Sequence, residues 1–349
     1  MKKDSEKKQK KKLKKWVKTL IIIGSIILSL GVILLGAIGY FKLSVLSYYK
    51  ASEKAFKLPE IHSGVVPQGF HYDQDNDLFL LSGYMKDGSQ SPVYAVDKNT
   101  GKATKKVFFE TETGALYTGH AGGITVWKDY FYLADGKGVL VYSYSSILKA
   151  AWGDKIECLG RFSTKVSNDD YINVSCLTVH NDRLIIGEFY RADSYPTPNS
   201  HKITTTAGDY NQAIGLQYLL SDTFNLGINP TPELAYSLPD HVQGMNFYQD
   251  KLYISTSWGL SFSHVYEYDQ TAFSFLADAE FLGYTLPVYA VDSSSLLHDY
   301  KIAPMSEEIA FADGYLYVLS ESASNKYIFG NFIGGTWCYK TDLNKMKNA

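Results

Sequence analysis

At residues 69–84 the chain reads GFHYDQDNDLFLLSGY: a small residue, an alternating apolar run, a polar turn and a second apolar run. Alternation with a period of two is typical of a half-buried strand, and Asp and Asn between two such runs indicate a hairpin. The pattern returns as GITVWKDYFYLADG (123–136), CLTVHNDRLIIGEFY (176–190), GMNFYQDKLYISTSWG (244–259) and EIAFADGYLYVLSES (308–322). The chain therefore contains five copies of one hairpin unit.

Further strand-like segments follow each hairpin. Third strands are predicted at 92–102, 138–148, 213–220, 264–270 and 336–343, and fourth strands at 105–111, 155–163, 232–239 and 298–304. Repeated units of four antiparallel strands are typical of a β-propeller. We predict an all-β fold of five four-stranded blades, in which LPEIHSG (58–64) completes the last blade. Six blades are the alternative, because the fourth unit contains an additional segment, LPVYAVD (286–292).

An apolar run of 23 residues, 19–41, precedes the repeats. At about 1.5 Å per residue it spans roughly 35 Å as a helix, enough to cross a bilayer. Residues 1–18 contain ten lysines, and the positive-inside bias places such an end in the cytoplasm. We predict a signal-anchor helix that crosses the cell membrane once, with the C-terminal domain extracellular. A cleaved signal peptide is the alternative, although its apolar stretch is normally shorter and GAIGY (36–40) is a poor cleavage site.

These features divide the chain into a basic cytoplasmic tail (1–18), a transmembrane helix (19–41), a stalk (42–57) and an extracellular propeller (58–349). The tail has a net charge of +8, whereas the remaining 24 basic and 34 acidic residues give −10. An acidic domain argues against a nucleic-acid partner. The three cysteines of the chain are too few for a disulfide framework in a domain of this size.

The residues just before the predicted inner strands should converge on the propeller axis. They are Gln68, His120, Asn173, His241, Gln243 and Glu307. Such side chains could bind a ligand or a cation, or they could satisfy one another and buried water. The adjacent Glu307 and Glu308 point to opposite faces of one strand and cannot form a catalytic pair. The acids of the second strands, Asp135, Glu188 and Glu321, are the other candidates for a partner.

Over residues 57–349 the strand rhythm resembles that of bacterial lactonase-like and NHL-type propellers. The resemblance implies a propeller fold. In the lactonase-like proteins it also implies a calcium ion on the axis, held by Glu, Asn and Asp. Glu307 and Asn173 match two of these ligands, whereas the Asp and a second Asn are not evident.

The largest insertion, YRADSYPTPNSHKITTTAGDYNQ (190–212), separates the second and third strands of the third unit. Its Thr, Ser, Pro and Asp content predicts an exposed loop on the channel face. Tyr190, Tyr195 and Tyr210, with Trp258 from the fourth unit, are expected to rim a pocket there. Aromatic rims with polar neighbours suit a carbohydrate or a peptide. Ordinary surface tyrosines are the alternative in a chain with 28 Tyr.

No catalytic motif identifies an enzyme, because G-x-S-x-G, H-E-x-x-H and P-loop patterns are all missing from the sequence. The leading interpretation is a membrane-tethered extracellular binding or scaffold module for a cell-surface carbohydrate, peptide or protein. The alternative is a metal-dependent hydrolase or lactonase with an axial site near Glu307.

Overall fold

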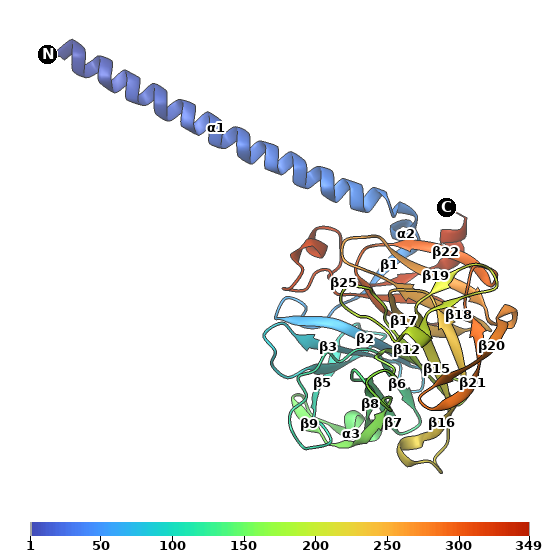
Figure 1. Ribbon diagram of the computed structural model, residues 1–349. Helices are drawn as coiled ribbons and strands as arrows, with labels where there is room; N and C mark the ends of the chain where they lie inside the picture. The colour runs from blue at the N-terminus through green and yellow to red at the C-terminus, as the bar shows by residue number, and fades with distance from the viewer. Residues whose placement is uncertain (1, 349) are drawn as a thin grey trace. The chain divides into compact units, whose positions relative to one another are not determined.

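The computed structural model describes residues 2–348, without the side chains of residues 2, 7 and 9–13. The chain forms two compact units that divide between Leu46 and Ser47. Helix α1 (Lys2–Leu43) makes up nearly all of the first unit (Figure 1). Its segment Lys14–Leu43 has a mean hydropathy of 2.8 and is long and apolar enough to cross a membrane. The predicted apolar helix is therefore confirmed.

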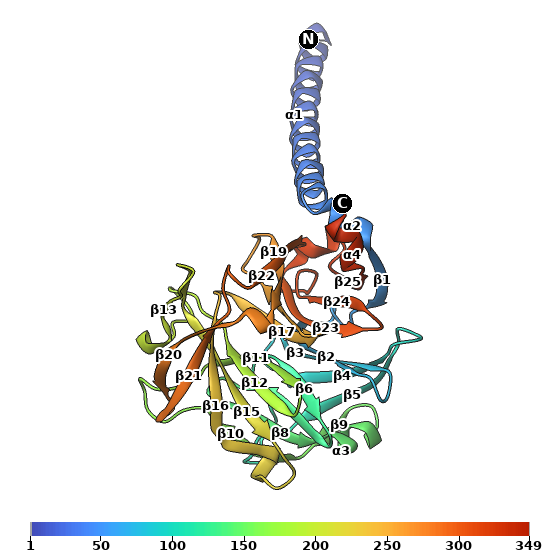
Figure 2. The same ribbon diagram turned by 90° about the vertical axis from the view of Figure 1, so that its right-hand side faces the viewer.

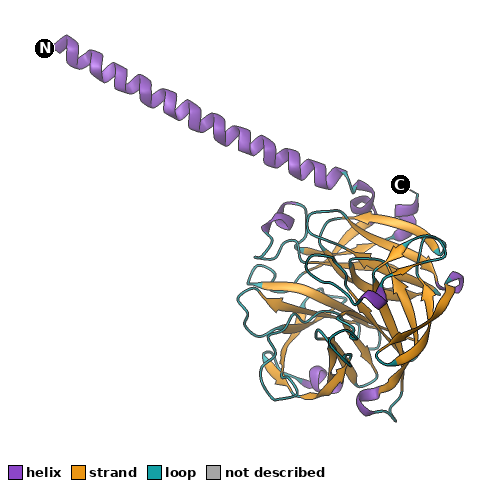
Figure 3. Ribbon diagram, viewed as in Figure 1, coloured by secondary structure: helices purple, strands orange, loops and turns teal. Residues whose placement is uncertain are grey.

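The second unit consists almost entirely of antiparallel strands arranged as five blades (Figure 3). Blade 1 contains β2 (Val65–Asp73), β3 (Leu78–Met85), β4 (Pro92–Asp97) and β5 (Ala103–Phe109). Blade 2 contains β6 (Ile124–Trp127), β7 (Tyr130–Ala134), β8 (Gly138–Ser143) and β10 (Cys158–Ser163). Blade 3 contains β11 (Val174–His180), β12 (Arg183–Glu188), β15 (Ala213–Leu220) and β16 (Ile228–Leu238). Blade 4 contains β17 (Val242–Tyr248), β18 (Lys251–Thr256), β19 (Ser263–Asp269) and β22 (Leu296–Ile302).

Blade 5 contains β23 (Ser306–Ala312), β24 (Tyr315–Ser320), β25 (Trp337–Thr341) and β1 (Ser52–Lys57). The first strands contact one another in a closed cycle, in the order β2, β6, β11, β17, β23 and back to β2. This closure confirms the predicted propeller of five blades.

The additional segment of the fourth unit does not form a sixth blade. It lies in β21 (Tyr284–Ala290), which pairs with β20 (Ser274–Phe281) and runs parallel to β16 at the edge of blade 3. Figure 2 shows this hairpin beside β16. The six-blade alternative is therefore wrong, because the hairpin extends an existing sheet and contributes no inner strand to the ring.

Strand β1 closes the propeller by pairing antiparallel with β25, from Ser52 opposite Thr341 to Lys57 opposite Trp337. Residues 52–57 were expected to be the end of a stalk, and 58–64 were expected to complete the blade. Instead, α2 (Leu46–Ala51) leads directly into the closing strand and the segment 58–64 forms turns. The pairing covers the open edge of β25, and Phe56 becomes almost completely buried.

Tight turns join the first two strands of three blades. The central residues at 181–182, 249–250 and 313–314 all have positive φ angles between 49° and 81°. This is the type I′ geometry whose twist matches that of the flanking strands. Apolar side chains from neighbouring blades fill the space between the sheets, as Tyr132 and Val139 do against Leu184 and Ile214.

Candidate functional site

The axis of the propeller is built from the first residue of each sequence copy. These residues are Gly69, Gly123, Cys176, Gly244 and Glu308. In four of the five inner strands the pairing register shifts beside this residue. Such a bulge takes backbone N–H groups out of the strand ladder. Four small residues therefore leave room, and free N–H groups, for the one large side chain.

Glu308 fills this space and joins three other blades. Its Oε2 accepts hydrogen bonds from the N–H of Phe70 and, at 3.2 Å, from the N–H of Ile124. The N–H of Leu177 also faces the carboxylate. Burial raises the pKa of Glu308 well above its usual value, while these N–H groups act in the opposite direction. At Gly244 a Cβ would lie 2.5 Å from the Glu308 Cα, so no larger residue fits there.

Glu307 lies close enough to Glu321, which follows β24, for the two charges to act on each other, and we call these two residues the carboxyl pair. Burial, and then the charges of Glu321 and Glu308, raise the pKa of Glu307 well above its usual value. Burial also raises the pKa of Glu321 to about 7. Both shifts favour the uncharged form of each carboxyl group. The side-chain amide of Gln68 donates a hydrogen bond to Glu321 Oε2 at 3.3 Å and another to the backbone carbonyl of Pro67 at 2.7 Å.

Three further side chains lie beside this carboxyl pair. Lys326 donates a hydrogen bond to the hydroxyl of Tyr84, and the Tyr84 ring stacks on His120 with centroids 4.5 Å apart. Water reaches His120, but protein surrounds the ring on most sides. The loss of hydration, followed by the charge of Lys326, lowers the pKa of His120 to about 4. His120 is therefore neutral at physiological pH.

The remaining predicted axial residues have other partners. The backbone N–H of Asn173 donates to Glu188 Oε1 at 3.1 Å. Gln243 makes a long contact of 3.5 Å with the carbonyl of Ser257. Tyr190 is 7% exposed and packs in the core between blades 3 and 4, so it does not rim a pocket.

The family resemblance implied a calcium ion held by Glu307 and Asn173. Ca²⁺ takes ionised carboxylates and carbonyl oxygens, whereas burial disfavours the charged form of Glu307. Among residues 2–348 no three His, Cys, Asp or Glu side chains are grouped so that they could hold a metal ion. Calcium at Glu307 and Asn173 stays a prediction from the resemblance.

The loop at 190–212 is anchored more firmly than its composition predicted. His201 Nδ1 lies 2.7 Å from Glu188 Oε2, and both side chains are completely buried. The backbone N–H of Ile214 donates to the same oxygen at 3.3 Å. This contact fixes the loop to the end of β12, although its composition suggested only an exposed segment.

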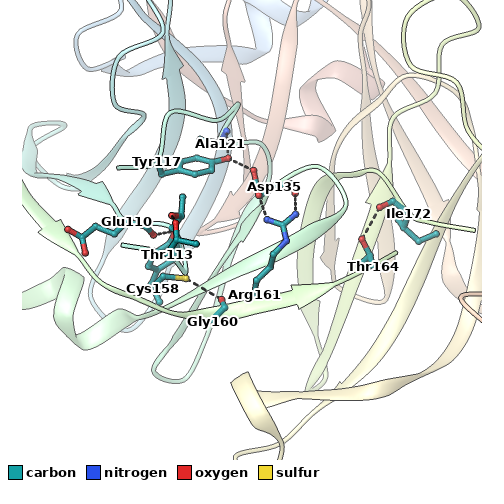
Figure 4. Close-up of polar contacts among 12 residues, drawn as sticks. Glu110, Thr113, Tyr117, Ala121, Asp135, Cys158, Gly160, Arg161, Thr164 and Ile172 are labelled. Carbon is teal, nitrogen blue, oxygen red and sulfur yellow. Dashed lines mark hydrogen bonds and ion pairs between the residues drawn. The ribbon is translucent and has the colours of Figure 1, made fainter. Parts of the chain in front are cut away.

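Asp135 is held in a structural ion pair (Figure 4). Its carboxylate pairs with Arg161 and accepts a hydrogen bond from the hydroxyl of Tyr117 at 3.0 Å. Arg161 also donates to the Asp135 carbonyl at 2.7 Å, and the N–H of Ala121 donates to the Tyr117 hydroxyl. These partners satisfy Asp135 and leave it no part in the axial carboxyl pair.

A cleft of about 600 Å³ lies between the loop at 190–212 and blade 4. Its aromatic lining consists of Tyr210, His241, Trp258, Phe262, His264, Tyr266 and Tyr268, and its acidic lining consists of Asp209, Asp240 and Asp292. The rings of His241 and Trp258 are roughly parallel, with centroids 6.4 Å apart. The guanidinium of Arg191 lies 3.8 Å from the Trp258 ring. The volume of this cleft is that of a small-molecule site, and Glu307, Glu308 and Glu321 are not among its lining residues.

The chain matches no protein-family model and no curated protein sequence. Solved structures share its fold. A GH43_1 enzyme from Xanthomonas citri aligns with a TM-score of 0.43 and 10% identity, over 85% of this chain and 92% of that chain. A gluconolactonase from Xanthomonas campestris aligns with a TM-score of 0.38 and 12% identity, over 76% and 75%. BamB from Moraxella catarrhalis aligns with a TM-score of 0.32 and 9% identity, over 73% and 82%.

The closed ring of five blades itself confirms the resemblance to propellers at the level of the fold. Alignments with identities of 12% or less and TM-scores below 0.5 carry no conclusion about function.

The aspartates that line the cleft were not predicted from the sequence. Asp240 and Asp292 come from two loops 52 residues apart, and neither lies in a recognisable motif. His201 was also missed, because the partner of this residue lies across an irregular loop. Glu321 was visible only as one of three second-strand acids.

Proposed function

We propose that the chain is a membrane-tethered binding protein of the cell surface, whose propeller holds a carbohydrate in the cleft between the 190–212 loop and blade 4. The observation that carries this proposal is the combination of aromatic rings and carboxylates in one cleft. Its volume lies within the usual range of roughly 300–1,000 Å³ for small-molecule sites. Sugar rings offer apolar faces to aromatic side chains and hydroxyl groups to carboxylates.

The tether supports a role at the cell surface. Helix α1 is long and apolar enough to cross a membrane, and its lysine-rich start favours a cytoplasmic N-terminus. The domain would then face outward, toward surface polysaccharides. Protease added to intact cells should degrade the propeller and spare the lysine-rich tail. A mature N-terminus near residue 40 in the medium would contradict the anchor.

The binding site itself is tested with Trp258. Trp258→Ala should weaken the binding of surface oligosaccharides to the full-length chain, measured by calorimetry in detergent. Trp152→Ala is the matched control, because Trp152 is also exposed (55%) but lies outside the cleft. Equal affinities of the two variants would contradict the proposed site.

The carboxyl pair of Glu307 and Glu321 favours a second candidate, an acid–base hydrolase. The pKa of Glu307 is raised well above its usual value and that of Glu321 is raised to about 7, and such raised values are typical of a carboxyl group that acts as a general acid. Glu321→Gln should abolish hydrolysis of oligosaccharide probes if this pair is catalytic. Trp258→Ala separates the two candidates, since it changes the cleft and leaves the pair intact.

A further inference from the structure

The charged side chains that line the cleft between the 190–212 loop and blade 4 are negative. Three carboxylates line it, those of Asp209, Asp240 and Asp292, and no lysine or arginine does so. Burial lowers the pKa of His241, so its ring adds no positive charge at neutral pH. Such a site attracts a cation and repels an anion.

His264 and Arg191 do not change this balance. His264 Nδ1 lies 2.6 Å from a fourth carboxylate, that of Asp299. Arg191 lies against the Trp258 ring outside the cleft lining, and its own acidic neighbour is Asp193 at 4.0 Å. The nearest guanidinium is therefore engaged with an aromatic face.

Two of the carboxylates are only partly satisfied. Asp292 is 3% exposed. Its Oδ1 accepts hydrogen bonds from the N–H and the hydroxyl of Ser294, at 3.0 and 2.6 Å, while its Oδ2 has no partner. Asp240 Oδ2 accepts from the amide of Gln212 at 2.8 Å, and its Oδ1 also has no partner. A buried carboxylate oxygen without a partner is costly, and an ammonium group with three N–H donors would satisfy it.

Aromatic rings stand beside these carboxylates. Tyr210 is 56% exposed and Trp258 is 36% exposed, so both rings remain available to a ligand. Cations bind favourably over such faces, and sugar rings pack on them. Anionic oxygens and aromatic faces in one cleft suit a ligand that has both a positive charge and an apolar ring face.

We propose that the ligand of this cleft carries a protonated amine and is an oligosaccharide of unacetylated amino sugars. This inference rests on the proposed carbohydrate-binding function and names the class of sugar. The amine lies against Asp292 and Asp240, and a sugar ring lies against Trp258. N-acetylation removes both the charge and two N–H donors, so it selects against the acetylated form of the same chain.

Two hexamers that differ only in acetylation test the inference. A glucosamine hexamer and an N-acetylglucosamine hexamer are titrated into the full-length chain in detergent at slightly acidic pH. We expect the glucosamine hexamer to bind at least about tenfold more tightly, a difference of about 1.4 kcal/mol. Added salt should weaken its binding, because exposed charge interactions are screened.

Asp292→Asn keeps the shape of the side chain and removes its charge. It should weaken the binding of the glucosamine hexamer about tenfold and that of the N-acetylglucosamine hexamer clearly less, so that the difference in affinity between the two hexamers shrinks. Asp240→Asn provides the same test if the first variant does not fold, which its melting temperature will show. The control is Asp278→Asn, an exposed acid on β20 outside the cleft.

The outcomes separate this inference from the function on which it rests. Equal affinity for both hexamers, unaffected by Asp292→Asn but reduced by Trp258→Ala, overturns the amine and retains the carbohydrate cleft. If neither hexamer binds, both the amino-sugar ligand and the carbohydrate-binding function are overturned.

Discussion

The carboxylate of Glu308 accepts a hydrogen bond from the backbone N–H of Phe70, although the two residues are 238 positions apart in the chain. The contact joins the inner strand of the last blade to that of the first. The same oxygen also reaches Ile124 in the second blade. One side chain therefore links the inner strands of three blades.

Removal of this carboxylate should destabilise the propeller strongly. Glu308→Ala leaves at least two buried N–H groups without an acceptor, each costing about 1–3 kcal/mol. We expect a loss of about 3 kcal/mol or more in the free energy of unfolding, measured by chemical denaturation.

Two further variants serve as comparisons. Glu308→Gln retains one acceptor oxygen and should lose less of the free energy of unfolding. Glu112→Gln, an exposed control, should stay within about 0.5 kcal/mol of the wild type. Equal stability of Glu308→Ala and this control would contradict a structural role for the carboxylate.

The space around Glu308 depends on Gly244. Gly244→Ala would place a Cβ 2.5 Å from the Glu308 Cα, which forces the inner strands of blades 4 and 5 apart. We expect a loss of about 2–3 kcal/mol, typical of overpacking. Gly153→Ala is the comparison. Its Cβ would meet nothing within 4 Å, although φ is +91°, so only a backbone cost of about 1 kcal/mol is expected. Thermal unfolding of both variants measures the two losses of stability. A smaller loss of stability in Gly244→Ala than in Gly153→Ala would contradict the tight packing around Glu308.

Glu321 should make stability depend on pH. Its pKa is raised to about 7 in the folded protein, so the folded state binds more protons than the unfolded state between about pH 4.5 and 7. The contribution of Glu321 to the free energy of unfolding is therefore fully present below about pH 4.5 and is lost as the pH rises to about 7. The size is at most about 3.5 kcal/mol, because one pKa unit corresponds to about 1.4 kcal/mol.

The comparison with Glu321→Gln measures the contribution of Glu321 together with the effect of its charge on Glu307. His71 and His120 act in the opposite direction, since their pKa values are lowered to about 4 and they lose stability as the pH falls. They are the same in both proteins and cancel in the difference. The stability of the wild type minus that of the variant should fall as the pH rises from 4.5 to 7. A difference that does not change with pH would mean that Glu321 ionises normally.

Strand β1 should be indispensable for the isolated domain. A chain that starts at residue 47 retains the closing strand, and we expect it to be monomeric and to melt cooperatively. A chain that starts at residue 58 exposes the edge of β25 and removes the buried Phe56 side chain. Open strand edges pair with other chains, so this shorter form should aggregate in size-exclusion chromatography. Identical behaviour of the two chains would show that β1 does not close the ring.

The repeats made the propeller predictable because each hairpin is a local feature. Alternating residues and a short turn lie within about 15 positions, and the same pattern occurs five times. Closure was harder to predict. SEKAFK (52–57) has little strand character of its own, and it pairs with residues nearly 290 positions away. The segment 286–292 was visible as an additional element, but its pairing with β20 and its attachment to blade 3 were not.

For the candidate site, the sequence by itself determined that Glu307 and Glu308 lie at the start of an inner strand, because the alternating pattern at 308–322 marks that strand. It also determined the apolar N-terminal helix. Only the tertiary structure decided that Glu321 is the neighbour of Glu307, that His201 anchors its loop to Glu188, and that Asp240 and Asp292 share a cleft with Trp258. These contacts join irregular loops from different parts of the chain. Ring closure sets their distances, and no local sequence pattern encodes that closure.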